Sequence, residues 1–281
     1  MTHMLSIQPA APDNQPARSR SNRWRWLIFG ALALLLLAWL NNTPEGLLGK
    51  ADAVGYAICH RIDARSFHLG TRQMPLCARC SGMYLGFLTG LAFLGLTRPR
   101  FGGMPSKPML FALGLLVLVF AIDGTNSYLH FFPNAPGLYE PNNTLRLLTG
   151  MGVGLSIAAV LFPAFNQTAL SHWVPRPALE RPHQLVFMLL LGLLVSLLVL
   201  SENSLILYPL ALLSVGGVLL MLSMVYGMLW MMLLKLENRI QRLGQLLLPI
   251  MGGLFFGILQ IALIDLGRYL LTGTWAGFTF G

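Results

Sequence analysis

The sequence predicts an all-α integral membrane protein with about seven transmembrane helices. Hydrophobic residues make up 55% of the 281 residues and charged residues only 10%. Apolar runs long enough to cross a hydrocarbon core of about 30 Å recur along the chain. This composition excludes an ordinary soluble domain. We therefore expect a multi-pass protein of the cell inner (cytoplasmic) membrane that contacts membrane lipid.

The N-terminal segment differs from the rest of the chain. Residues 1–23 are polar and lack hydrophobic periodicity, which predicts a disordered, basic cytoplasmic tail. The first apolar run, Trp26–Leu40, follows several arginines, as in a signal peptide. However, the sequence NNTP at residues 41–44 offers no small-residue cleavage site. We expect an uncleaved first transmembrane helix.

Six further apolar runs predict the remaining spans. They lie near Cys80–Leu96, Met109–Phe132, Thr144–Phe165, Gln184–Leu200, Leu205–Leu234 and Gln245–Leu271. The sixth span of the seven is too long for a straight crossing, and Pro209 or Gly216-Gly217 is expected to bend or tilt it. Residues 24–271 thus form a single transmembrane domain, followed by a short outer tail at 272–281.

The distribution of positive charge predicts the orientation. The chain has 19 Lys+Arg against 10 Asp+Glu. With a cytoplasmic N-terminus and an outer C-terminus, 12 of the 19 basic residues are cytoplasmic, in agreement with the positive-inside rule. Five of the other seven lie in the single stretch 50–79. We find no basic patch interleaved with aromatic residues, so no nucleic-acid partner is expected.

The segment before the second span contains most of the residues that could bind a metal or react. It contains all three cysteines, and Cys77 and Cys80 form a C-x-x-C pair at a helix start. A helix N-terminus and the nearby Arg79 favour thiolate, the form that binds metal. Cys59 with His60 or His68 can complete a four-ligand set, which predicts a zinc or iron site. A thiol/disulfide couple and inert structural thiols remain the alternatives.

Other polar residues are predicted to share the outer side with the cysteines. Asp123 and Arg146 are the candidates for a catalytic role, as acid/base or ligand and as anion clamp. Further polar residues are expected around this pocket: Arg61, Arg65, Arg79, Asn126, His130, Asn143, Asp265 and Arg268. We expect Asp123 to pair with Arg146, because a buried carboxylate needs such a partner.

Glycines at helical spacing predict close helix packing. Gly82, Gly86 and Gly90 give the second span a smooth face, and the pairs 150/154 and 253/257 do so on the fourth and seventh. Such faces also allow oligomers. The run GMGVG at 150–154 lies in a span and follows no strand, so no nucleotide cofactor is expected.

Several of these residues fall into specific motifs. The chain has CHR at 59–61, RSF at 65–67 and PLCARCSGMYLG at 75–86. It also has Asp123-Gly124 in a span, followed by N-x-x-R-x-x-T-G at 143–150. These motifs closely resemble the uncharacterised prokaryotic membrane-protein family known as domain of unknown function 2085. The resemblance covers a core of about residues 50–165, so the spans within 184–271 are additional helices. It implies where a site lies but no reaction, and it does not extend to Asp265 or Arg268.

Three functions remain open at the level of sequence. One is a metal-binding membrane protein whose outer site acts on an anionic lipid head group or another amphiphile. Another is a transporter or channel subunit that uses Asp123 and Asp265. The third is a metal-stapled scaffold or a thiol/disulfide protein. No Ser-His-Asp order, phosphate loop or zinc-protease helix motif decides whether the protein is an enzyme.

Overall fold

In the part of the chain that the structure describes, the protein is a bundle of eight α-helices with two small strand pairs. Its structure, a computed structural model, describes residues 20–132 and 137–276. The α-helices are α1 (Arg20–Asn41), α2 (Gly46–Ile58), α3 (Ala78–Thr97), α4 (Lys107–Leu129), α5 (Asn143–Ala169), α6 (Pro182–Leu200), α7 (Ser204–Leu233) and α8 (Leu247–Thr272). Short 3-10 helices cover Asp63–Arg65 (η1) and Leu243–Leu246 (η2). The predicted tail and outer tail lie mostly outside the described residues, and α1 already begins at Arg20.

The transmembrane character predicted from composition is confirmed. Six helices, α3 to α8, are long and apolar enough to cross a membrane. A seventh span is possible if α1 and α2 are counted together, although the chain bends by 102° between them. The sequence predicted α1 but missed α2, whose residues GLLGKADAVGYAI include a lysine and an aspartate and form no long apolar run.

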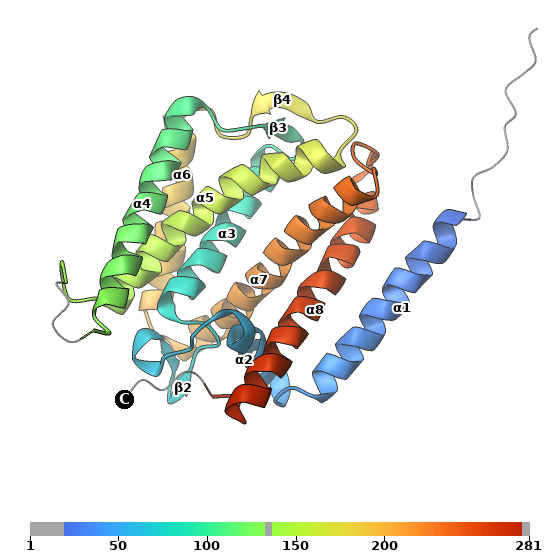
Figure 1. Ribbon diagram of the computed structural model, residues 1–281. Helices are drawn as coiled ribbons and strands as arrows, with labels where there is room; N and C mark the ends of the chain where they lie inside the picture. Colours follow the sequence, from blue (N-terminus) through green and yellow to red (C-terminus); the bar gives the residue numbers. More distant parts are fainter. Residues whose placement is uncertain (1–19, 133–136, 277–281) are drawn as a thin grey trace, which may run out of the picture.

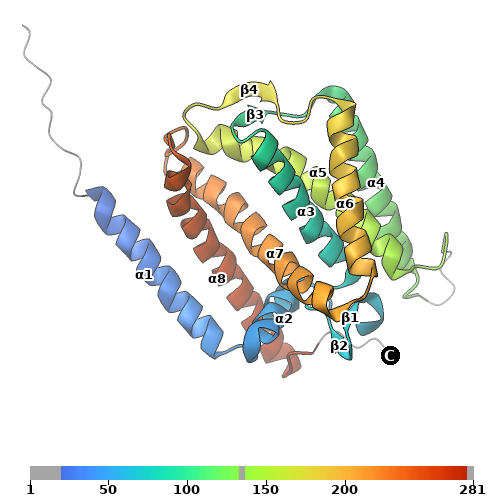
Figure 2. The same ribbon diagram turned by 180° about the vertical axis from the view of Figure 1, so that it is seen from behind.

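The long helices lie side by side, and each runs in the opposite direction to the long helix before it in the chain (Figures 1 and 2). One end of the bundle gathers α2, the start of α3 and α5, and the last turns of α4 and α8. We call this the cysteine end. α7 runs through Pro209 as one helix of 30 residues, which corresponds to about 45 Å at 1.5 Å per residue.

Helices α3 and α5 interlock through the glycines that the sequence singled out. A Cβ atom on Gly82 would lie 2.2 Å from the Leu147 carbonyl oxygen. A Cβ atom on Gly154 would lie 2.0 Å from the Met83 carbonyl oxygen. Both distances are far below van der Waals contact, so only glycine permits this approach. The close packing predicted for these two spans is confirmed.

Helices α7 and α8 pack in a similar way. A Cβ atom on Gly253 would lie 2.0 Å from the carbonyl oxygen of Ser223. Helix α1 packs against the side of α8 that faces away from α7 (Figures 1 and 2). The cores of the bundle are built from aliphatic and aromatic side chains such as Leu155, Phe87 and Ile261.

Two short strand pairs close the ends of the bundle. At the cysteine end, β1 (His68–Leu69) pairs antiparallel with β2 (Arg72–Gln73), joined by a turn with Gly70 at a positive φ of 64°. At the opposite end, β3 (Phe101–Gly103) pairs in parallel with β4 (Val174–Pro177).

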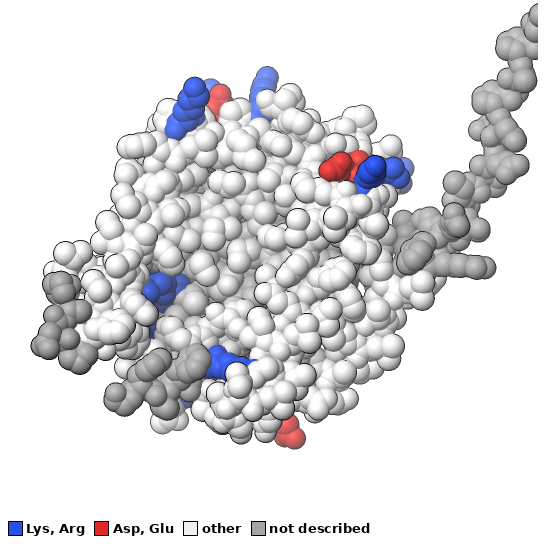
Figure 3. Space-filling view, viewed as in Figure 1, with Lys and Arg blue, Asp and Glu red and all other residues white. Residues whose placement is uncertain are grey.

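The surface carries few charges between the two ends. On the face in Figure 3, charged side chains gather toward the two ends and leave a broad uncharged band. Helices α4 and α6 expose large apolar residues, among them Phe111, Leu118, Phe187 and Leu194. Such a band suits contact with lipid tails rather than with water.

Candidate metal centre and polar site

The three cysteines meet at the cysteine end. Cys59 follows the last residue of α2, Cys77 precedes the first residue of α3, and Cys80 lies in the first turn of α3. Their sulfur atoms all lie within 4.8 Å of one another, and all three thiols are free. Cys59 and Cys77 are buried, and the backbone N–H of Cys77 donates to the Cys59 Sγ at 3.4 Å.

A close backbone contact explains why Cys59 reaches the C-x-x-C pair. A Cβ atom on Gly55 would lie 2.0 Å from the Pro75 carbonyl oxygen, so α2 packs directly on the segment before α3. Cys59 comes one helical turn after Gly55, and Cys77 comes two residues after Pro75. The contact therefore fixes the distance between the two cysteines. No motif or glycine spacing in the sequence singles out this glycine.

Among the three thiols, Cys59 accepts hydrogen bonds and Cys77 and Cys80 donate them. Hydrogen bonds from Cys77 and Cys80 lower the pKa of Cys59 well below its ordinary value, despite burial. The hydrogen bond to Cys59 raises the pKa of Cys77 to about 12. The N-terminus of α3 adds positive potential at the same place. The cluster therefore favours one thiolate, on Cys59, held by neutral thiols.

The two candidate histidines lie differently. The His68 Nε2 is 2.9 Å from the Asp63 Oδ1, and the structure does not bring this exposed ion pair to the thiols. His60 adjoins Cys59, and its Nδ1 accepts a hydrogen bond of 3.0 Å from the Ile62 N–H. In that arrangement the proton of the neutral ring is on Nε2, and His60 is not among the residues whose ligand atoms come together in the thiol cluster. Burial, followed by repulsion from Arg65, Arg79 and Arg146, lowers its pKa against an opposing effect of Cys59.

The segment between His60 and the strands is held by Asp52 of α2. Its carboxylate pairs with Arg61 at 3.0 Å and with Arg72 at 2.7 Å. Arg61 has a positive φ of 51°, a conformation that costs free energy for a non-glycine residue and is found where the surroundings enforce it. Asp52 was missed from the sequence because it lies in the unpredicted helix α2.

Asp123 pairs with Arg79, which corrects the predicted pairing with Arg146. The carboxylate of Asp123 is 1% exposed and accepts a hydrogen bond from the Arg79 guanidinium. Tyr139 and Thr149 donate to it as well, at 2.8 and 3.2 Å. Arg79 is the correct partner because it lies between the two cysteines, in the first turn of α3, and Gly150 lets α5 approach its backbone closely.

Arg146 is buried without a carboxylate partner among the described residues. It is 7% exposed and donates to the Asn143 Oδ1 at 2.8 Å. Its buried Nε has no hydrogen-bond partner in the part of the chain that the structure describes. Asn142 caps α5 by accepting from the Leu145 N–H at 2.8 Å, which fixes this turn of the helix. Asn143 also donates to the carbonyl oxygens of Ala64 and Ser66, at 3.3 and 3.4 Å.

Three arginines thus share one small region with one carboxylate. Burial, followed by repulsion from Arg146 and Arg79, lowers the pKa of Arg65. Arg65 itself donates to the Ser127 carbonyl oxygen at 3.1 Å and lies over the Phe131 ring, 3.8 Å from its centre. The region holds excess positive charge beside the thiols.

The remaining predicted residues have structural partners. Asn126 holds the segment before α5, since it donates to the Tyr139 carbonyl oxygen and accepts from the Leu138 N–H. His130 ends α4 with its ring near the Asn126 carbonyl oxygen, and its Nε2 is 4.0 Å from Glu140. Arg268 donates to the Cys59 carbonyl oxygen at 3.1 Å, which ties α8 to the thiol cluster.

Asp265 lies apart from the thiol cluster, between α1 and α8. Its Oδ2 accepts a hydrogen bond of 3.0 Å from the Trp39 Nε1–H. The structure therefore separates the two predicted aspartates, with Asp123 among the arginines and Asp265 against the first helix.

Comparison with known proteins also separates the thiol and arginine site from Asp265. The family model described as "Predicted membrane protein (DUF2085)" matches residues 59–160. An uncharacterized protein of Methanothermobacter thermautotrophicus is 35% identical over 103 residues, which is 37% of this chain and 83% of that protein. The chain belongs to this family. A second relative, an uncharacterized protein of Methanocaldococcus jannaschii, is 32% identical over 114 residues, which cover 40% of this chain and 67% of that protein.

The region matched to the family model contains the whole thiol and arginine site. Cys59, Cys77, Cys80, Asp123 and Arg146 all lie within residues 59–160. Helices α6, α7 and α8, with Asp265 and Arg268, lie outside that region. No solved structure matches the chain.

Proposed function

We propose that this DUF2085 protein is a metal-binding membrane protein whose centre is formed by Cys59, Cys77 and Cys80. The observation that carries the proposal is the convergence of three free thiols, with sulfur atoms within 4.8 Å of one another, from two separate segments of the chain. Thiolate sulfur is a preferred ligand of zinc and of iron. Zinc is the metal that we favour, because it needs no redox partner and is commonly bound by three cysteines.

The surrounding charges support a bound metal–thiolate group. Three thiolates with one Zn²⁺ carry a net charge of −1. Arg65, Arg79 and Arg146 supply three positive charges nearby, and Asp123 neutralises one of them. A buried charge is stabilised only when an opposite charge compensates it. The arginine cluster therefore compensates the charge of the metal-bound thiolates.

The centre would leave one coordination position for an external ligand. A tetrahedral zinc ion with three protein ligands has a fourth position, as in catalytic zinc sites. His60, whose Nε2 is the donor, would hydrogen-bond to a ligand there rather than fill the position. Arg146, buried beside the cluster, would hold an anion. The ligand that fits these groups is an anionic group, and at the end of a membrane bundle we propose the head group of an amphiphile.

A second function is favoured by the same geometry. A C-x-x-C pair at a helix N-terminus and a third cysteine with a lowered pKa are also features of thiol/disulfide exchange proteins. In that case the Cys59 thiolate would attack a substrate disulfide and release one substrate thiol. Cys77 or Cys80 would then attack the mixed disulfide, release the second substrate thiol and leave a disulfide with Cys59.

Metal analysis of the purified full-length protein tests the proposal. We expect about one zinc or iron ion per chain. Changing Cys59, Cys77 or Cys80 to Ser should remove most of this metal, because each thiolate is a ligand. His68→Asn is the matched control and should retain the metal, since His68 pairs with Asp63 away from the thiols. Metal-free protein with a disulfide between two of the three cysteines would contradict the proposal and favour thiol/disulfide exchange.

The role of Arg146 needs a separate measurement. Arg146→Gln should retain the metal but weaken binding of vesicles or micelles that contain phosphatidylglycerol, compared with phosphatidylcholine. Equal binding of both lipids by the wild-type protein would remove the anionic head group from the proposal and leave the metal centre in place.

A further inference from the structure

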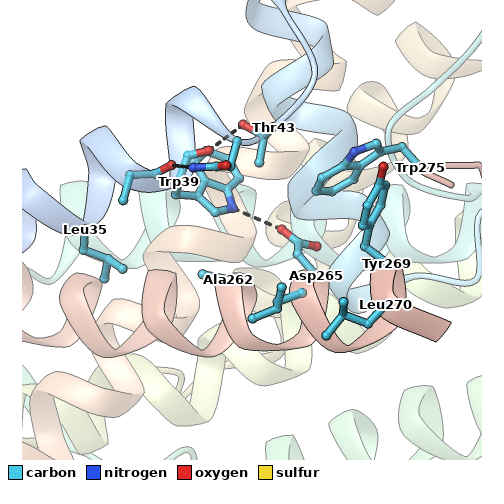
Figure 4. A pocket seen from close by; sticks show the side chains of 11 residues that line it. Leu35, Trp39, Thr43, Ala262, Asp265, Tyr269, Leu270 and Trp275 are labelled. Carbon is cyan, nitrogen blue, oxygen red and sulfur yellow. Dashed lines mark hydrogen bonds between the residues drawn. The ribbon is translucent and has the colours of Figure 1, made fainter. Parts of the chain in front are cut away.

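A second polar site lies in a groove between α1 and α8 (Figure 4). The groove has a volume of about 610 Å³. Its walls are mostly apolar, with Leu35 and Ala38 on α1 and Ala262, Leu266 and Leu270 on α8. Both helices have the length and apolar composition of membrane helices, α1 as part of the bent pair. An alkyl chain fits this kind of wall better than water does.

One buried carboxylate interrupts the apolar lining. Asp265 is 3% exposed, and Trp39 Nε1–H donates to its Oδ2 at 3.0 Å. Its Oδ1 is buried and has no hydrogen-bond partner among the described residues. Figure 4 shows the carboxylate lining the groove, with one oxygen toward Trp39 and the other on the side of Tyr269 and Trp275. A buried carboxylate oxygen without a donor is costly, and a ligand that supplies a donor removes this cost.

Two aromatic residues of the lining, Tyr269 and Trp275, lie on the side of this second oxygen (Figure 4). The ring centre of Trp275 is 5.4 Å from that of Tyr269 and 5.2 Å from that of Tyr56. Tyr269 and Trp275 both line the groove. The faces of tryptophan and tyrosine rings attract cations, and Trp does so most strongly. The groove thus combines one negative charge, two aromatic faces and an apolar channel.

We propose that this groove binds an amphiphile with a protonated amine as its head group, taken up from the surrounding membrane. The ammonium group would donate to the Asp265 Oδ1 and lie against Trp275 and Tyr269, while the apolar chain would lie between Leu35 and Leu266. A neutral head group would add no charge to a hydrogen bond with the buried Oδ1, and an anionic head group would be repelled by the carboxylate. A metal ion would find only one acidic side chain in the lining. This site does not depend on the thiol centre.

Two brominated probes of equal chain length test the proposal. Bromine quenches tryptophan fluorescence at short range, and Trp39 and Trp275 both line the groove. The full-length protein in maltoside micelles is titrated with 12-bromododecylamine and with 12-bromododecanol. We expect the amine to bind at least about tenfold more tightly, because only the amine forms a charge-assisted hydrogen bond.

Two variants locate the binding. Asp265→Asn keeps an oxygen that accepts from Trp39 but removes the charge, so the preference for the amine should disappear. Ala262→Phe fills the groove and should weaken binding of both probes, and it decides the question if Asp265→Asn does not fold. Equal affinities of the two probes for the wild-type protein would overturn the proposal. A preference that survives in Asp265→Asn, or an unchanged affinity of Ala262→Phe for the amine, would also overturn it.

Discussion

Arg79 connects the C-x-x-C turn of the candidate metal centre to the buried carboxylate of Asp123. Its backbone belongs to the C-x-x-C turn, and its guanidinium pairs with the buried Asp123 of α4 and donates to the Ser127 Oγ at 2.9 Å. A buried ion pair of this kind adds little stability in itself, but it fixes the position of both groups. The sequence placed Arg79, Asp123 and Arg146 at one end of the molecule, but it could not rank the two arginines as partners. That ranking depends on how far α3 is rotated against α5.

A double-mutant cycle tests the pairing of Arg79 with Asp123. Arg79→Gln and Asp123→Asn should each lower the free energy of unfolding by about 3–5 kcal/mol, since each leaves a buried charge unpaired. The double variant should lose clearly less than the sum. Unfolding is measured in micelles by denaturant titration. The matched control is Asp123→Asn with Arg146→Gln, for which the coupling should be smaller. A larger coupling with Arg146 would contradict the geometry.

Proton release on metal binding tests the state of the thiols. The pKa of Cys77 is raised to about 12, so this group is a thiol near pH 7 and must lose its proton to bind metal. Zinc affinity should therefore rise with pH, and at least about one proton per zinc should be released. Calorimetry in two buffers of different ionisation heat measures the release. Binding without proton release would contradict a protonated Cys77.

At the scale of elements, the sequence predicted the long helices and missed the short one. Apolar runs identified all six helices that could cross a membrane, because burial in lipid demands an apolar side chain at nearly every position. Helix α2 has no such run, and its place is fixed by tertiary contacts of Gly55 and Asp52. For this reason the residues that bring Cys59 to Cys77 could not be predicted.

The interlocked glycines of α3 and α5 give a prediction about stability. Gly154→Ala should lower the free energy of unfolding by about 1–3 kcal/mol, because its Cβ atom would meet the Met83 backbone. Gly114→Ala on α4 is the control, since a Cβ atom there meets nothing within 4 Å. The control should be neutral or slightly stabilising. Equal effects of the two changes, measured by thermal unfolding in micelles, would contradict close α3–α5 packing.

At the scale of the whole molecule, the polar site occupies one end of the bundle. The cysteine end holds the thiols, the three arginines and Asp123, and β3 with β4 covers the opposite end (Figure 1). The positive-inside rule predicts that the cysteine end faces the outer side of the membrane. The order of the helices decides which residues share an end, whereas the orientation in the membrane rests on the charge distribution alone.

Reporter fusions test this orientation. Reporters fused after Phe101 and after Glu237 should be cytoplasmic, and a reporter near Arg72 should be on the outer side. The reason is that 12 of the 19 basic residues lie in the segments on the predicted cytoplasmic side. Alkaline phosphatase, which is active only outside the cytoplasm, gives the readout. An inactive reporter near Arg72, with activity after Phe101, would reverse the predicted orientation without changing which residues lie together.

X-ray absorption at the metal edge tests the central claim most directly, because it counts the ligands of the metal in the purified protein. Three cysteines without a ligating histidine predict three sulfur atoms at about 2.3 Å from zinc, with one lighter oxygen or nitrogen atom completing the shell. His68→Asn should leave the sulfur count unchanged, since His68 pairs with Asp63 away from the thiols. A shell without sulfur, or a shell with four sulfur atoms, would contradict a centre built from Cys59, Cys77 and Cys80 of one chain.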